Sequence, residues 1–229
     1  MDNREQEKQL AARKSLDFLT DGQVVGLGTG TTATYMIRFL GERVRAGLRI
    51  RGIASSVHSQ ELAASLGIPL TTLAESPEID VCIDGADEID PALQLIKGGG
   101  GALLREKIVA SASRKFVVIA DSSKQVPVLG KCPLPVEVVP FAEALLARRI
   151  AALGASVVLR RDKTGQPFVT DGGHHLLDCS FGAIAEPFAL SQKLRDMPGV
   201  VDHGLFLNMA DVVLIAKGSH VMEHRRAQR

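Results

Sequence analysis

The 229-residue chain carries 27 Lys and Arg against 26 Asp and Glu, so its formal net charge is +1 at pH 7. With this balance of charges, the protein has no strong positive electrostatic field that would attract nucleic acid. No apolar run approaches the ~18 residues of a membrane span, and the charged amino terminus lacks the apolar region of a signal peptide. We therefore expect a cytoplasmic protein that binds neither membranes nor nucleic acid.

Apolar strands and helices alternate along the first 120 residues, after a first helix at about residues 4–19. The expected strands are 23–27, 50–54, 79–83 and 116–120, and the expected helices are 31–46, 58–66 and 102–113. Strands that alternate with helices in this way predict βαβ units on a parallel sheet.

A proline-rich stretch at residues 126–140 separates this part from a second pattern. The expected elements beyond it are strand 134–139, helix 142–153, strand 155–161, strand 167–170 or 175–180, helix 186–196 and strand 200–205. The order β-α-β-β-α-β is typical of a ferredoxin-like unit, and a last strand at 211–216 should rejoin the first sheet. We predict an α/β fold: a Rossmann-like parallel-sheet domain (1–130 plus 206–229) and a smaller α+β ferredoxin-like domain (131–205).

The segment Gly26-Leu27-Gly28-Thr29-Gly30-Thr31-Thr32-Ala33 lies between the first strand and its helix. Glycines and hydroxyl residues at such a turn can hold phosphate through N–H and O–H groups. The spacing also fits a dinucleotide fingerprint, which expects an acid about 20 residues further on. The next strand ends instead in Ser55-Ser56, so a single phosphate is favoured over a nicotinamide cofactor.

An acidic segment, Asp84-Gly85-Ala86-Asp87-Glu88-Ile89-Asp90, follows the strand at 79–83. In open α/β sheets, ligands bind at the carboxyl ends of strands. An Asp-Gly turn or a helix cap is an equally good interpretation of these residues taken alone.

Four consecutive glycines, Gly98 to Gly101, lie between Lys97 and a helix that contains Glu106. Such a run suits a backbone that must approach a ligand closely, and its N–H groups at a helix N-terminus suit an anion or an oxyanion. The alternative is a flexible turn.

Metal and thiol chemistry are not indicated. The three cysteines, Cys82, Cys132 and Cys179, are widely spaced, which is typical of reduced thiols in a reducing compartment. His174 and His175 lie near Asp171, but neighbouring side chains on a strand point to opposite faces. We therefore expect no metal site. The arginines near the end, Arg225, Arg226 and Arg229, are interpreted as a solvated basic tail.

Four motifs in this order resemble ribose-5-phosphate isomerase, type A. They are Gly-Thr-Gly-Thr-Thr-Ala (28–33), Asp-Gly-Ala-Asp-Glu-Ile-Asp (84–90), Lys-Gly-Gly-Gly with Leu-Leu-Arg-Glu-Lys (97–107) and Ala-Asp-Ser-Ser-Lys (120–124). The resemblance continues through 134–138 to 198–206 and so covers nearly the whole chain. It implies a homodimeric aldose–ketose isomerase of the pentose phosphate pathway that needs no metal or other cofactor.

The resemblance also implies roles for particular residues. Glu106 matches the family's base, Lys97 would stabilise the enediolate oxygen, and Asp84 and Asp87 match the carboxylates that bind hydroxyls and open the sugar ring. The positions that match substrate contacts are Lys8, Thr29, Gly30, Thr31, Thr32, Asp84, Gly85, Ala86, Asp87, Lys97, Gly98, Gly99, Gly100 and Lys124. Thr31 replaces a common serine, and 170–174 departs from the family's usual Asp-Asn-Gly-Asn.

Three other functions remain open at this point. A non-catalytic sugar-phosphate sensor would keep the 28–33 loop without needing Glu106 or the two aspartates. A glucosamine-phosphate deaminase-like enzyme would share the fold and an enediolate step. A dehydrogenase is the least favoured, because the ribose-binding acid is missing.

Overall fold

The computed structural model describes residues 3–226, and contacts between residues divide the chain into two compact units. The first unit contains the residues up to Ala86, Arg105–Lys124 and the residues from Met209 onward. The second contains Asp87–Leu104 and Gln125–Asn208. The domain limits expected above, at residues 130 and 206, remain a prediction, and the contacts group 87–104 with the second unit.

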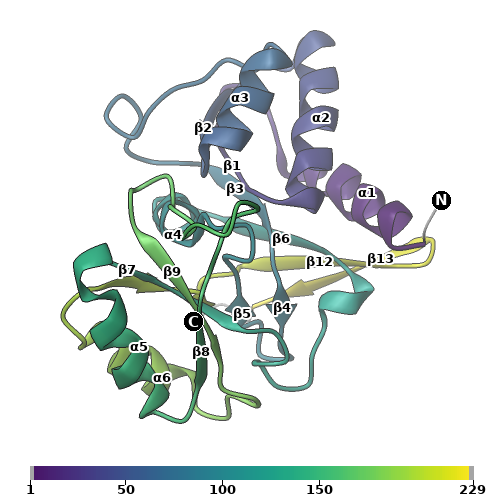
Figure 1. The fold of residues 1–229 in the computed structure, drawn as a ribbon. Coiled ribbons are helices and arrows are strands. Elements are labelled where there is room, and N and C mark those ends of the chain that lie inside the picture. Colours follow the sequence, from purple (N-terminus) through teal and green to yellow (C-terminus); the bar gives the residue numbers. More distant parts are fainter. Residues whose placement is uncertain (1–2, 227–229) are drawn as a thin grey trace. The chain divides into compact units, whose positions relative to one another are not determined.

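The first unit is built on a six-stranded sheet with the spatial order β13-β12-β6-β3-β1-β2 (Figure 1). Its strands are β1 (Val24–Leu27), β2 (Arg51–Ala54), β3 (Val81–Gly85), β6 (Phe116–Asp121), β12 (Val212–Lys217) and β13 (His220–Arg225). All neighbours pair in parallel except β12 and β13. The predicted parallel sheet, with the last predicted strand rejoining it, is confirmed.

Helices cover both faces of this sheet, as the alternation of strand side chains requires. The helices of this unit are α1 (Asn3–Ser15), α2 (Thr31–Arg45), α3 (Val57–Ser65) and α4 (Leu103–Ser111), of which α4 begins in the second unit. Val25 and Leu27 of β1 share a core with Met36 and Leu40 of α2. The intervening Gly26 faces Val109 of α4, which would lie 2.8 Å from an added Cβ.

Glu7 of α1 joins three segments of the first unit. Its side chain is 2% exposed, and Oε2 accepts hydrogen bonds from the backbone N–H (3.0 Å) and the hydroxyl (2.8 Å) of Ser122. Its Oε1 accepts the Gly218 N–H at 2.8 Å. Burial acts to raise the pKa of Glu7, but the donors from Gly218 and Ser122 together hold this pKa below its usual value.

Glu7→Gln should lower the free energy of unfolding by about 1–3 kcal/mol at pH 7, since a charged acceptor of buried N–H groups is lost. The lowered pKa of Glu7 means that its contribution is full above its unfolded-state pKa and is lost as pH falls through the folded value. Urea unfolding at pH 7 and near pH 3 measures the difference, which should shrink at low pH. Glu61→Gln, on the exposed face of α3, is the control; an equal loss in both variants would contradict the prediction.

The second unit has a four-stranded antiparallel sheet of order β10-β7-β9-β8 with two helices against it (Figure 1). Its elements are β7 (Leu134–Val138), α5 (Glu143–Ala151), β8 (Ser156–Leu159), β9 (His175–Ser180), α6 (Pro187–Arg195) and β10 (Val200–His203). Leu146 and Ile150 of α5 and Leu194 of α6 share one core with the strands. The expected ferredoxin-like unit is confirmed, with 175–180 as its third strand.

A small three-stranded sheet, also in the second unit, has the order β11-β5-β4. Its strands are β4 (Glu88–Ile89), β5 (Leu95–Ile96) and β11 (Leu205–Phe206). The predicted strand 200–205 therefore ends early, because the chain changes sheets at Gly204. Gly204 donates its N–H to Pro135 O at 2.7 Å, and an added Cβ would lie 2.3 Å from Lys97 O.

The predicted basic tail is partly a strand. Arg225 ends β13 and pairs with Glu223 at 2.5 Å, whereas Arg226 donates to Ala210 O at 2.9 Å. Arg229 lies outside the described residues. Among residues 3–226, no helix combines the length and the apolar character that crossing a membrane requires.

Candidate functional site

Three predicted site residues of the first unit, together with Ser55, lie at the carboxyl ends of adjacent parallel strands. Thr29 follows β1, Ser55 follows β2, Asp84 lies in β3, and Lys124 follows β6 in a short 3-10 helix (Ser122–Lys124). The connection from β1 runs to β2 on one side, whereas β3 leads to β6 on the other. The order in which the chain adds strands to the sheet therefore reverses between β1 and β3. Ligands bind at such a switch point in open α/β sheets.

Asp84 contacts the loop at residues 28–33, which is called the phosphate loop below after its predicted role. Its Oδ1 accepts the N–H of Thr29 at 2.9 Å and the N–H of Gly85 at 2.7 Å, and the residue is 1% exposed. A Cβ on Gly28 would lie 2.2 Å from Asp84 Oδ1 and 2.5 Å from Asp84 Cα. The loop can therefore lie against the Asp84 carboxylate only because residue 28 is a glycine. The N–H groups of Thr29 and Gly85 fix the orientation of this carboxylate. Gly85 and Ala86 continue the chain from Asp84.

Three serine hydroxyls gather around Thr29, and sequence reasoning did not identify them as site residues. Thr29 Oγ1 lies 2.8 Å from Ser55 Oγ and 2.9 Å from Ser56 Oγ. Ser59 Oγ lies 3.3 Å from Thr29 Oγ1 and donates to Gly28 O at 2.6 Å. The available signal was the position of Ser55 and Ser56 directly after a predicted strand.

The remaining predicted phosphate contacts of the first unit lie on two helices. Thr31 and Thr32 form the first turn of α2 after Gly30, where the first N–H groups of a helix have no intrahelical acceptor and favour an anion. Lys8 lies in α1 and pairs with Glu5 at 2.6 Å, and Glu5 also accepts the Tyr35 hydroxyl at 2.8 Å.

Lys124→Ala should raise the KM for a phosphorylated substrate by about 10–150-fold, because a lost charge-assisted hydrogen bond costs about 1.5–3 kcal/mol. Steady-state kinetics of the variant measure this change. Lys115→Ala is the matched control, since Lys115 precedes the same strand and is exposed. An unchanged KM in Lys124→Ala would show that this lysine does not bind the phosphate.

The predicted residues of the second unit form a separate group around the glycine loop, defined here as Gly98–Gly101. Asp87 Oδ2 accepts the Gly99 N–H at 2.8 Å, and a Cβ on Gly99 would lie 2.8 Å from Asp87 Oδ1. The Gly101 N–H closes a turn onto Gly98 O at 3.0 Å. Two of the loop's amides are thus used inside the unit.

Lys97 is the bulkiest of the fully buried side chains of residues 3–226, with 2% exposure. It follows β5, and its backbone N–H donates to Gly204 O at 2.9 Å. Its ammonium lies 5.3 Å from the centroid of the Phe206 ring, which favours a cation through the ring quadrupole. A buried ammonium interacts with an anion far more strongly than one in water.

Glu106 belongs to the first unit and lies in the first turn of α4, with 4% exposure. The N-terminal end of a helix favours a carboxylate over its neutral form. The structure therefore places a shielded carboxylate at the predicted base position.

The other acids and histidines of the predicted segments have local structural partners. Glu88 accepts the N–H groups of Gly130, at 2.7 Å, and of Cys132. Asp90 Oδ1 accepts the Gln94 N–H at 2.8 Å, as in an Asx turn. The two neighbouring histidines contact different carboxylates: His174 Nδ1 lies 2.9 Å from Glu137 Oε1, and His175 Nδ1 lies 2.6 Å from Glu143 Oε2. Within residues 3–226, no three His, Cys, Asp or Glu side chains are placed to hold a metal ion.

Together these features define the structural class of the protein. The chain is an α/β protein with hydroxyl and acidic groups at the switch point of a parallel sheet and a ferredoxin-like second unit.

Comparison with known proteins identifies the family. Residues 51–220 match the family model for ribose 5-phosphate isomerase A (phosphoriboisomerase A), and the chain belongs to this family. Ribose-5-phosphate isomerase A of Parvibaculum lavamentivorans is 49% identical, over 96% of this chain and 99% of that protein. The predicted family and enzyme class, an aldose–ketose isomerase, are therefore confirmed.

Solved structures agree with this assignment. A D-ribose-5-phosphate isomerase in complex with phospho-erythronic acid has a TM-score of 0.95 and 37% identity, over 97% of this chain and 99% of that chain. Ribose 5-phosphate isomerase A of Methanocaldococcus jannaschii has a TM-score of 0.92 and 40% identity, over 96% of this chain and 99% of that chain. The predicted fold class is confirmed.

Proposed function

We propose that this protein interconverts D-ribose 5-phosphate and D-ribulose 5-phosphate through a cis-enediolate, with Glu106 as the base. The observation that carries the proposal is the hydrogen bond from Thr29 N–H to Asp84 Oδ1 at the sheet's switch point. It joins a phosphate-type loop to a buried carboxylate. Membership of the isomerase family and the phospho-erythronic acid bound to a relative support the same substrate class.

The reaction moves one carbon-bound proton between neighbouring carbons. Glu106 takes the proton from C2 of the open-chain aldose and returns it to C1, while a second proton passes from O2 to O1. A carboxylate suits this task because its two oxygens can reach both carbons. The enediolate carries negative charge on oxygen, which Lys97 and an amide of the glycine loop would stabilise.

Asp84 and Asp87 are proposed to bind the sugar hydroxyls and to open the ring, since pentose phosphates are mostly cyclic in water. Backbone N–H groups orient both carboxylates, that of Thr29 on Asp84 and that of Gly99 on Asp87. The phosphate is proposed to bind at Thr29–Thr32 with Lys124. Groups that hold the substrate in the right orientation can raise the reaction rate by several orders of magnitude, because the translational and rotational entropy is already lost when the substrate binds.

A coupled assay for ribulose 5-phosphate tests the proposal. Turnover of ribose 5-phosphate is expected, with ribose a very poor substrate. Ribose 5-phosphate binding without turnover would support the sensor instead, and ammonia release from glucosamine 6-phosphate would support the deaminase-like enzyme. Turnover should persist after exhaustive treatment with EDTA; a loss that a divalent ion restores would contradict the metal-free mechanism.

We also propose a cytoplasmic homodimer that acts in the pentose phosphate pathway. Large apolar side chains of the second unit support self-association, because Phe141, Val158 and Phe188 are 101%, 62% and 51% exposed and such side chains are costly to leave in water. Light scattering on the purified protein should give twice the mass of one chain, and the mass of a single chain would contradict the dimer.

A further inference from the structure

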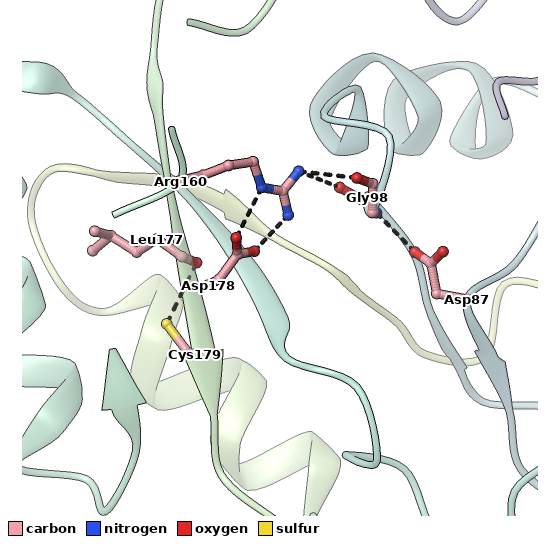
Figure 2. A network of polar contacts seen from close by, with 7 residues as sticks. Asp87, Gly98, Arg160, Leu177, Asp178 and Cys179 are labelled. Atoms are coloured by element: carbon pink, nitrogen blue, oxygen red, sulfur yellow. Dashed lines mark hydrogen bonds and ion pairs between the residues drawn. The ribbon is translucent and has the colours of Figure 1, made fainter. Parts of the chain in front are cut away.

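Arg160 connects the second strand of the ferredoxin-like sheet to the glycine loop, and nothing above gives it a function. It directly follows β8, and its side chain is 16% exposed. Its Nε and Nη2 donate to Asp178 Oδ2 and Oδ1 at 2.9 and 2.5 Å. Its Nη1 donates to both Gly98 O and Gly99 O, each at 3.1 Å (Figure 2). Four of the five N–H donors of a guanidinium are thereby used.

We propose that Arg160, oriented by Asp178, is a positioning residue that sets the direction of the glycine loop's amides toward the substrate oxygen. This inference rests on the proposed isomerase function, in which that loop stabilises the enediolate. The residues concerned, Asp87, the glycine loop, Arg160 and Asp178, all belong to the second unit.

The peptide bonds of the loop show how the positioning works. In a planar trans peptide the C=O and N–H point in opposite directions. Arg160 binds Gly98 O while Asp87 binds the Gly99 N–H, so the Gly98–Gly99 peptide is held at both ends. Figure 2 shows Arg160 and Asp87 on opposite sides of the loop.

The next peptide, Gly99–Gly100, is held by its carbonyl alone. Arg160 binds Gly99 O, so the Gly100 N–H must point away from the guanidinium. Gly100 is exposed, and its N–H has no hydrogen-bond partner within residues 3–226. Arg160 therefore determines where this remaining donor points.

The chain needs such a support because glycines provide no side chains to fix their backbone. Gly98 and Gly101 have φ values of +97° and +89°, a conformation that glycine leaves easily. The two carbonyl oxygens that Arg160 Nη1 binds carry partial negative charge. The guanidinium offsets their mutual repulsion and polarises the peptides, so that the opposite N–H becomes a stronger donor. A lysine could not replace the arginine, since it lacks the planar fork.

Phe168 supports the same loop from another side. Its backbone N–H donates to Arg160 O at 2.9 Å, and the centroid of its ring lies 5.9 Å from the guanidinium carbon Cζ. A Cβ on Gly101 would lie 2.5 Å from Phe168 Cζ. The glycine loop is therefore in contact with the cation of Arg160, the carboxylate of Asp87 and the aromatic ring of Phe168. Of these three residues, only Asp87 was predicted as a site residue.

The first test compares Arg160→Ala and Arg160→Lys with Arg161→Ala. Arg161 is the matched control, because it is the exposed neighbour and its Nη1 contacts only its own loop, at Gly165 O. In both Arg160 variants kcat should fall about 10–100-fold, as for a misplaced oxyanion donor, with KM changed less than threefold. Calorimetry should show that phospho-erythronate binds more weakly by a similar factor, whereas the affinity for inorganic phosphate should be unchanged. The binding stoichiometry should also be unchanged, since it reports the fraction of the protein that is folded. A kcat within threefold of wild type, or a parallel loss of phosphate affinity, would overturn the proposal.

The second test does not depend on activity. With ¹⁵N-glycine labelling, hydrogen exchange of the Gly99 amide should be at least tenfold faster in Arg160→Ala than in wild type and unchanged in Arg161→Ala. Unchanged exchange in Arg160→Ala overturns the positioning role even if the protein isomerises ribose 5-phosphate. Faster exchange in a protein that lacks this activity would uphold the control of the loop and refute the proposed function instead.

Discussion

Glu106→Gln should reduce kcat by about 10²–10⁴-fold or more, the range that a positioned general base contributes. The amide keeps the size and the hydrogen-bonding ability of the side chain but cannot take a proton from carbon. The residue is 4% exposed in the first turn of α4, so water cannot easily replace the missing base. The coupled assay gives kcat, and calorimetry on the same variant gives the affinity for substrate.

Affinity should change far less than turnover, because the proposed phosphate and hydroxyl contacts belong to other residues. Glu61→Gln, the same change on the exposed face of α3, controls for the substitution itself. Near-normal turnover in Glu106→Gln would leave Glu106 as an ordinary carboxylate favoured by the helix dipole. That result would show that another group acts as the base.

Gly28→Ala should be the most disruptive single change at the phosphate loop. Its Cβ would lie 2.5 Å from the backbone Cα of Asp84, and backbone cannot move aside as a flexible side chain can. Overpacking of this kind costs about 1–3 kcal/mol and sometimes more. We expect a lower urea midpoint and weaker phosphate binding, because the Gly28 N–H also pairs with Ile83 O at 3.0 Å and holds β1 beside β3.

Gly85→Ala is the matched control at the end of the neighbouring strand. Its Cβ would have only ordinary contacts, at 3.9 Å, with Ile119 O and Thr29 O. Its urea midpoint should therefore stay close to that of wild type. Equal destabilisation of both variants would show that the loop's glycines matter for flexibility and not for the close approach to Asp84.

Elements with a local signal could be predicted from the sequence. The strands of the parallel sheet are apolar on both faces, since helices cover both sides, and this makes β1, β3 and β6 visible as continuous runs. The positions of the phosphate loop, the acidic segment and the glycine run are also local, because each is a short motif next to a strand or a helix. The family followed from their order along the chain.

Other features depend on partners that are distant in sequence. The strands β4, β5 and β11 have two residues each, too few for any periodicity, and exist only because they pair with one another. The edge strand β13 is mostly exposed and lacks an apolar face, so its pattern resembles a solvated tail.

The tertiary structure alone also decided how the site's loops are held. Ser55, Ser56 and Ser59 reach Thr29 because β2 lies beside β1, and Arg160 reaches Gly98 and Gly99 across more than sixty residues. No local propensity encodes such contacts, since they arise only when burial of the apolar faces brings the strand ends together. The sequence by itself thus determined the family and predicted which residues do the chemistry, and the packing of the sheets decided which side chains hold those residues in place.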